Sequence, residues 1–125
     1  MREIVFIIFV VMLSSCSEKQ QSPEEVLEEY MVLISQGKCE QAKSLSTEAM
    51  KETLQGSIDA GCEPWDMEIV SIDCQTTGNK SACCYRDKRP TGEMEFGYYL
   101  EIENGSWKVS GIEPYLGGPC IKSEQ

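Results

Sequence analysis

The spacing of hydrophobic residues changes from helical to alternating near Met67, and this change divides the chain into two halves. Before this point, apolar residues recur on one broad helical face from Val26 to Ile34, and every fourth residue from Met50 to Cys62 is apolar. Beyond it, apolar and polar residues alternate. A 3.6-residue period is typical of amphipathic helices and a two-residue period of half-buried strands. The pattern therefore predicts an α+β fold, with helices first and a sheet second.

Three helices are predicted in the first half. Ser22 and Glu25 form a Ser-x-x-Glu capping box around Pro23, which suits the first helical position. This helix is expected to end at Gly37. A second, short helix is expected from about Lys38 to Leu45, and a third after Ser46.

The clearest strand has Met94, Phe96, Tyr98, Leu100 and Ile102 on one side and mostly acidic residues on the other. Asn104-Gly105 follows, the sequence typical of a two-residue type I′ hairpin turn. This turn would place Ile102 opposite Trp107, Leu100 opposite Val109, and Glu101 opposite Lys108. The predicted register puts both apolar sets on one face.

An earlier hairpin is predicted between residues 67–74 and 80–86. If Gly78-Asn79 forms its turn, Cys74 lies opposite Cys83 at a non-hydrogen-bonded pair. The α-carbons of such a pair are about 4.5 Å apart, which a disulfide tolerates. A turn one residue longer or shorter would change the partner.

The N-terminal segment has the pattern of an export signal. Arg2 precedes an apolar run from Ile4 to Leu13, which is shorter than the roughly 20 residues of a membrane-spanning helix. Leu13-Ser14-Ser15-Cys16 resembles the lipobox of bacterial lipoproteins. We therefore predict a signal peptide over 1–15, acylation of Cys16, a polar tether over 16–21 and a single domain over 22–125. The alternative is an ordinary signal peptide or an uncleaved anchor.

Seven cysteines would be unusual in a reducing compartment. If Cys16 carries the acyl chains, six cysteines remain in the domain, an even number that is typical of a disulfide framework. Cys39–Cys62 would join the start of the second helix to the end of the third. Cys74–Cys83 follows from the hairpin register. Elimination then leaves Cys84–Cys120.

Charge and composition exclude several functions. The formal net charge of −10 disfavours nucleic acid as a partner. Histidine is absent, and so is any Cys-x-x-Cys spacing, so neither a metal nor a cofactor is expected. The basic residues Lys80, Arg86, Lys88 and Arg89 precede Pro90. We interpret them as a solvated loop rim, with contact to an acidic partner or phosphorylated lipid head groups as the alternative.

Three helices followed by a meander of about four strands resembles the nuclear-transport-factor-like, ketosteroid-isomerase-like superfamily of cystatin-like folds. It is similar above all to small bacterial lipoproteins of unknown function. The resemblance is carried by residues 22–26, 35–42, 45–50 and 104–109. It implies a first helix that packs across a curved sheet and leaves a cone-shaped cavity. Enzymes of the superfamily line this cavity with acids, tyrosines or histidines, whereas binding members keep it mostly apolar.

The sequence therefore predicts a non-catalytic, lipid-anchored envelope domain that binds a small ligand or another envelope protein. Because Ser17 follows Cys16, we expect delivery to the outer membrane, facing the periplasm, if the source is Gram-negative. The candidate pocket or contact residues are Tyr30, Trp65, Tyr85, Tyr98 and Trp107.

Two alternatives remain open. One is an isomerase- or hydratase-like enzyme with a carboxylate base in the cone, for which Asp66 and Asp73 offer the residue type. A buried acid beside a tyrosine in an open pocket would favour it, whereas a cavity filled by Trp107, Phe96 and Met31 would exclude it. The other is a structural or immunity-type protein that acts through its sheet face.

Overall fold

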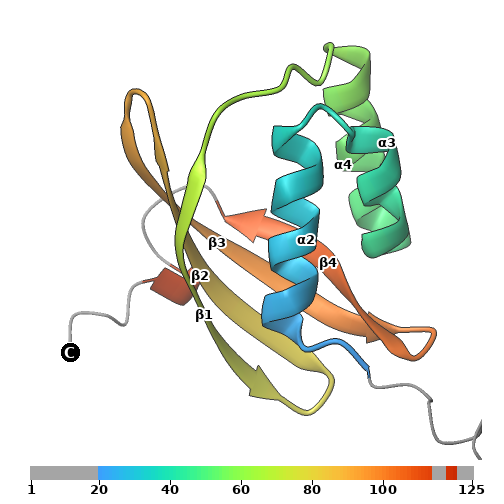
Figure 1. Cartoon of the computed structure of the whole chain (residues 1–125). Coiled ribbons are helices and arrows are strands. Elements are labelled where there is room, and N and C mark those ends of the chain that lie inside the picture. Colours follow the sequence, from blue (N-terminus) through green and yellow to red (C-terminus); the bar gives the residue numbers. More distant parts are fainter. Residues whose placement is uncertain (1–19, 114–117, 121–125) are drawn as a thin grey trace, which may run out of the picture.

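The computed structural model describes residues 20–113 and 118–120, and its architecture is three helices on an open four-stranded sheet (Figure 1). The helices are α2 (Pro23–Ser35), α3 (Cys39–Ala42) and α4 (Glu48–Asp59), and the single turn η2 (Lys43–Leu45) extends α3. This order confirms the predicted α+β class. Within the described ranges, no helix combines the length and the apolar character needed to cross a membrane.

The two longer helices, α2 and α4, each begin at a polar side chain that caps the first turn. The Ser22 hydroxyl accepts from the backbone N–H of Glu25, and the Glu25 carboxylate accepts from the N–H of Ser22. Thr47 caps α4 in the same way, because its hydroxyl accepts from the N–H of Met50. The caps satisfy backbone donors that have no partner inside a helix.

The sheet is an antiparallel meander in the order β1-β2-β3-β4. Its strands are β1 (Glu68–Thr77), β2 (Lys80–Arg89), β3 (Gly92–Glu103) and β4 (Ser106–Glu113). Both predicted registers are present, since Cys74 lies opposite Cys83 and Ile102 lies opposite Trp107. At the turn between β3 and β4, Asn104 and Gly105 have φ of 55° and 81°, the left-handed backbone that a type I′ turn requires.

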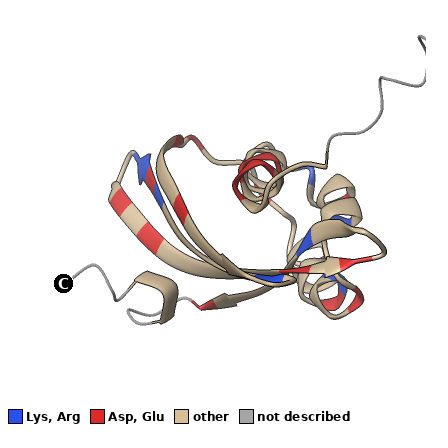
Figure 2. Cartoon of the chain, turned by 90° about the horizontal axis from the view of Figure 1, so that it is seen from below, with Lys and Arg blue, Asp and Glu red and all other residues tan. Residues whose placement is uncertain are grey.

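The two faces of the sheet are covered by different elements (Figure 2). The concave face, which the helices cover, carries Cys83, Tyr85 and Asp87 from β2 and Phe96, Tyr98 and Leu100 from β3. The convex face carries Cys84 and Arg86 from β2 and Glu95, Gly97 and Tyr99 from β3, and the short turn at 118–120 lies against it. The hydrophobic core lies between the concave face and the helices; α2 contacts both edge strands, β1 and β4.

Three disulfides join Cys39 to Cys62, Cys74 to Cys83, and Cys84 to Cys120. These are the pairs that the cysteine spacing and hairpin register predict. The first closes the α3–α4 unit, the second joins β1 to β2, and the third attaches the 118–120 turn to the sheet. Small domains gain from such crosslinks because their cores are modest.

Two predictions about exposure are wrong. Met94 is 37% exposed although the alternation places it on the core side, because the β2–β3 hairpin extends beyond the helices (Figure 1). The basic residues 80–89 do not form one rim. The pleat sends Arg86 and Arg89 to opposite faces, and Lys80 and Arg89 stand at opposite ends of β2, about 30 Å apart.

The predicted signal segment 1–15, Cys16 and tether residues 17–19 lie outside the described residues, as do 114–117 and 121–125.

Candidate functional site

A cavity of about 370 Å³ lies between α4, the C-terminal half of α2, the segment after α4, and the concave face of the sheet. Most of its lining is apolar, and Glu63 is the only carboxylate among the described residues that line it. The lining residues are Tyr30, Ile34, Cys39, Met50, Thr53, Leu54, Ser57, Ala60, Cys62, Glu63, Trp65, Tyr98 and Ile112. Ile112 is 39% exposed, and Thr53, Ser57, Ala60 and Glu63 are exposed as well, so the cavity is open to solvent between α4, the segment after it and β4.

Tyr98 is the centre of an aromatic cluster beneath this cavity. Its ring makes edge contacts with the rings of Tyr30, Tyr85 and Phe96, with centroids 6.2, 5.9 and 6.4 Å away. Edge-to-face geometry at these distances is favourable for aromatic pairs. The cluster therefore gives the inner end of the cavity a rigid aromatic surface.

A buried carboxylate lies behind this cluster. Asp87 is 0% exposed and accepts three hydrogen bonds: from the Tyr85 hydroxyl at 2.6 Å, from Arg89 Nε at 2.9 Å and from an Arg89 terminal nitrogen at 3.0 Å. A buried charge needs this kind of pairing, because an unpaired ion in a low-dielectric interior is costly. The carboxylate oxygens are thus occupied by the protein's own donors, and Asp87 does not line the cavity.

The Arg89 guanidinium also stacks on aromatic rings. Its central carbon lies 4.8 Å from the centroid of the Trp65 ring and 5.7 Å from that of Phe96. Such cation–π contacts hold the Trp65 indole at the cavity wall. Trp65 is also fixed through its backbone N–H, which donates to the Ser35 carbonyl at the end of α2.

Burial raises the pKa of the three clustered tyrosines. Desolvation raises the pKa of Tyr30 to about 12. The pKa of Tyr98 rises further for the same reason, and that of Tyr85 rises through desolvation and then through its hydrogen bond to Asp87. All three therefore keep their protons at neutral pH and can donate hydrogen bonds.

The five candidate residues separate into two groups. Tyr30, Trp65 and Tyr98 line the cavity, and Tyr85 lies behind Tyr98. Trp107 is buried at the other end of the core, where it borders a separate pocket of about 270 Å³ near Val26 and Leu45. Met31 is buried as well and does not line the cavity, which stays open at the Tyr98 end.

The two carboxylates considered for an enzyme are not in this cavity. Asp66 and Asp73 are exposed; the former borders a shallow pocket at the end of α2, and the latter borders a groove on the other side of the sheet. The buried acid beside a tyrosine is instead Asp87, which the sequence analysis did not single out. Its position two residues after Tyr85, on the inward side of β2, was the available signal.

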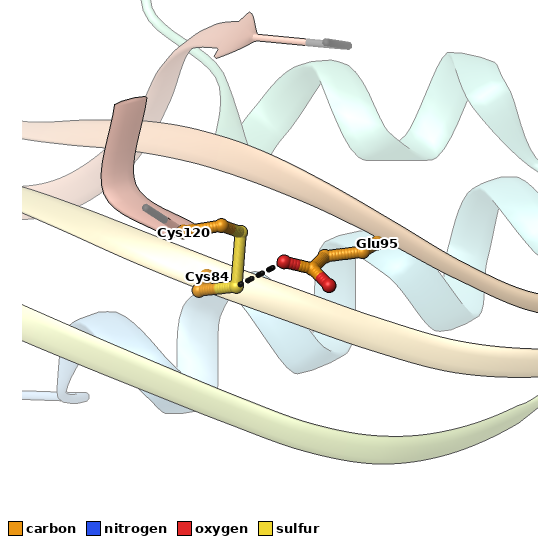
Figure 3. A group of neighbouring side chains, drawn as sticks. All are labelled: Cys84, Glu95 and Cys120. Carbon is orange, nitrogen blue, oxygen red and sulfur yellow. Dashed lines mark hydrogen bonds between the residues drawn. A yellow bond between two sulfur atoms is a disulfide. The ribbon is translucent and has the colours of Figure 1, made fainter. Parts of the chain in front are cut away.

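On the convex face, Cys84, Glu95 and Cys120 place their sulfur and oxygen atoms within 4.8 Å of one another (Figure 3). The two sulfurs are bonded to each other, so neither is a thiolate that could ligate a metal. Glu95 Oε2 lies 3.7 Å from Cys84 Sγ, and its other oxygen pairs with Arg86 Nε at 3.5 Å. This group joins the 118–120 turn to the sheet beside a groove of about 510 Å³.

Comparison with a solved structure supports the arrangement of three helices on an open four-stranded sheet. An NTF2-like protein of unknown function from Cytophaga hutchinsonii ATCC 33406 superposes with a TM-score of 0.50 at 13% identity, covering 78% of this chain and 96% of that one. The chain has an NTF2-like fold. A de novo designed NTF2 fold protein gives a TM-score of 0.44 at 17% identity, over 74% of this chain and 87% of the design.

No family model matches the sequence, and no curated protein matches it. The likeness to the Cytophaga protein confirms the predicted fold. It does not indicate a function, because folds of this kind host many functions.

Proposed function

We propose that this chain is a lipid-anchored domain of the bacterial envelope that holds a small apolar ligand in its cavity. The observation that carries the proposal is the 370 Å³ cavity, open to solvent and lined mainly by apolar and aromatic side chains. Small-molecule sites are typically concave, mostly apolar, and about 300–1,000 Å³ in volume.

The electrostatics of the cavity favour binding over proton-transfer chemistry. The buried acid, Asp87, is held by Tyr85 and Arg89 and lies outside the lining. Glu63, the carboxylate that does line the cavity, is exposed at its rim. A general base needs a carboxylate within reach of a bound substrate, and the described lining places none at the inner end.

The attachment of the N-terminal tether gives the anchored domain an orientation. The side-chain amide of Gln20 donates to the Gly105 carbonyl at 2.7 Å, which holds the start of the domain at the β3–β4 hairpin. The segment after α4, which borders the cavity, lies at the opposite end of the molecule (Figure 1). Four residue steps separate Cys16 from Gln20, a reach of about 14 Å. An acylated Cys16 would thus keep the hairpin near the bilayer and the cavity away from it.

The cavity is tested with the neutral hydrocarbon 2-ethylnaphthalene in equilibrium dialysis against the purified domain. We expect saturable binding to the wild type and at least about tenfold weaker binding to Thr53→Trp, because the added indole fills the cavity beside α4. Glu52→Trp, on an exposed position of the same helix, is the matched control and should bind as the wild type does. Equal binding by all three proteins, or none by the wild type, would refute the proposed site.

The anchor is tested separately with Cys16→Ser in the native host. We expect this variant to leave the membrane fraction, whereas Ser17→Ala, the neighbouring control, remains there. Acyl chains contribute about 0.8 kcal/mol per buried methylene, so their loss should release the domain completely. Unchanged fractionation of Cys16→Ser would contradict lipid anchoring.

A further inference from the structure

The two edge strands of the sheet, β1 and β4, differ in what covers their outer backbone groups (Figure 1). The edge of β4 is covered, because Ser46 forms a parallel bridge with Val109 and the N–H of Thr47 donates to the Val109 carbonyl at 3.0 Å. Among the described residues, only β2 forms backbone hydrogen bonds with β1. A strand edge without a partner is a template for another extended segment.

The register of β1 shows which of its backbone groups point outward. The α-carbons of Cys74 and Cys83 are 3.9 Å apart, the shorter spacing of a non-hydrogen-bonded pair. Such pairs alternate with hydrogen-bonded ones, and the register is continuous over 71–77, so Ile72 and Thr76 are also in non-hydrogen-bonded pairs. The N–H and C=O groups of Ile72, Cys74 and Thr76 therefore point away from β2. They form a regular row about 14 Å long.

This part of β1 lacks the usual protection of an edge strand. Bulges, lysines and prolines discourage pairing at natural edges. The bulge of β1 lies between Ile69 and Ser71, where Val70 is 49% exposed, and residues 71–77 contain neither lysine nor proline. The stretch 71–77 is thus regular enough to accept a further strand.

A groove of about 510 Å³ gives such a strand room beside β1. The four consecutive residues 72–75 border it, and their side chains alternate between the two faces of the sheet. Glu24 of α2 borders the groove from the helix side, and Pro119 borders it from the convex side. The groove therefore follows the edge of the strand.

The charges at this groove favour a cationic partner. Glu24 and Asp73 bring two carboxylates to it, and neither forms an ion pair within the described ranges. Arg86 is the one basic residue in its described lining, and it pairs with Glu95 at 3.5 Å. The whole chain carries a formal net charge of −10. A second copy of this acidic chain would be repelled, whereas a basic segment would be attracted.

We propose that the open edge of β1 binds an extended, lysine- or arginine-rich segment of a partner protein as an additional antiparallel strand. Main-chain hydrogen bonds to Ile72, Cys74 and Thr76 supply affinity, and alternate side chains of the added strand supply specificity. Its basic side chains lie on the Asp73 side of the sheet and its aliphatic ones on the Ile72 side. The groove shares no lining residue with the 370 Å³ cavity, so this site does not depend on the proposed ligand.

The charge preference is tested by titration calorimetry with the capped heptapeptide Lys-Val-Lys-Val-Lys-Val-Lys. We expect the wild type to bind it and Asp73→Lys to bind it at least about fivefold more weakly, because attraction becomes repulsion. Glu52→Lys changes the net charge equally at an exposed position of α4, and it should bind as the wild type does. Equal weakening in both variants, or no binding by the wild type, would overturn the proposal.

Pairing at the edge is tested with methylated versions of the same peptide. Residues opposite each other in an antiparallel pair point to the same face, so the valines would be the ones that bond to β1. N-methylation of the three valines should abolish binding, whereas N-methylation of the lysines should not. Bound peptide should also slow hydrogen exchange at the amides of Ile72, Cys74 and Thr76 more than at Asp73 and Gln75, which already face β2. Equal binding of the two methylated peptides would exclude edge pairing.

Two other occupants of the edge would each contradict the proposal. If sedimentation shows a wild-type dimer that the peptide dissociates, a second copy occupies β1. If the peptide binds only after residues 121–125 are removed, this chain's own segment occupies it. We expect a monomer in sedimentation, and peptide binding by the full chain.

Discussion

The two faces of the sheet are built from the same strands but are stabilised in different ways. The concave face packs long aromatic and aliphatic side chains against the helices and pairs Asp87, the one fully buried acid among the described residues, with Arg89. The convex face has no α-helix over it in the described ranges, only the single 3-10 turn at 118–120. It holds the 118–120 turn through a covalent bond and a close approach at Gly97. The concave face therefore depends on packing and on a buried ion pair, whereas the convex face depends mainly on one crosslink and the contacts beside it.

The largest effect is expected from Asp87→Ala on the concave face. This change leaves Arg89 and the Tyr85 hydroxyl without their shared acceptor, and breaking a buried ion pair costs about 3–5 kcal/mol. Urea unfolding would measure the loss. Asp73→Ala, an exposed acid on β1, is the control and should change the free energy of unfolding by less than about 0.5 kcal/mol. Similar losses in both variants would contradict the special role of the buried network.

On the convex face, the double variant Cys84→Ser, Cys120→Ser should lower the free energy of unfolding by about 3–4 kcal/mol, from the loop entropy of a 36-residue separation. We further expect it to leave the concave face intact, so binding of 2-ethylnaphthalene should persist. Loss of the cavity together with the crosslink would show that the two faces are not independent.

Gly97→Ala should have a smaller effect, confined to the convex face. A β-carbon at this position would lie 2.6 Å from Cδ of Pro119, so the turn or the strand must move. Overpacking of this kind costs about 1–3 kcal/mol. Hydrogen exchange would locate the change at the 118–120 turn and the adjacent part of β3. Gly56→Ala is the control, because a β-carbon there meets no atom within 4 Å.

The smallest predicted effect is a loss of stability in alkali that depends on Tyr30. Its pKa is raised from 10.0 to about 12 in the folded state, so its contribution is complete below pH 10 and is lost as the pH rises toward 12. Between pH 10 and pH 11 this one group should cost about 1 kcal/mol. Unfolding of the wild type and Tyr30→Phe at both pH values measures the difference. A loss equally large in Tyr30→Phe would assign it to other groups.

The sequence was informative where a local rule determines the geometry. The Asn104-Gly105 turn sets the register that pairs Ile102 with Trp107, and the Gly78-Asn79 turn does the same for Cys74 and Cys83. Each turn needs only its own residues and the strand pleat, so both hairpins could be predicted without knowledge of the remaining fold.

Long-range features were harder to predict. The pattern could not show that the β2–β3 hairpin extends beyond the helices, which exposes Met94. Arg89 was also predicted to be solvated, because the sequence does not show which side chains surround a charged residue in the folded chain. Asp87, Trp65 and Phe96 come together around this guanidinium only in the folded chain. Three of the predicted contact residues do share a cavity, but the buried Nε1 of Trp65, which has no partner among the described residues, is visible only once the packing is known.

The adjacent residues Cys83 and Cys84 have a consequence for how this chain acquires its crosslinks. Oxidants cannot distinguish two neighbouring thiols by sequence, whereas an ordered strand points one toward β1 and the other toward Cys120. Correct pairing thus requires the hairpin to exist before oxidation is complete. A chain oxidised too early could exchange the two partners and would then need a disulfide isomerase to recover.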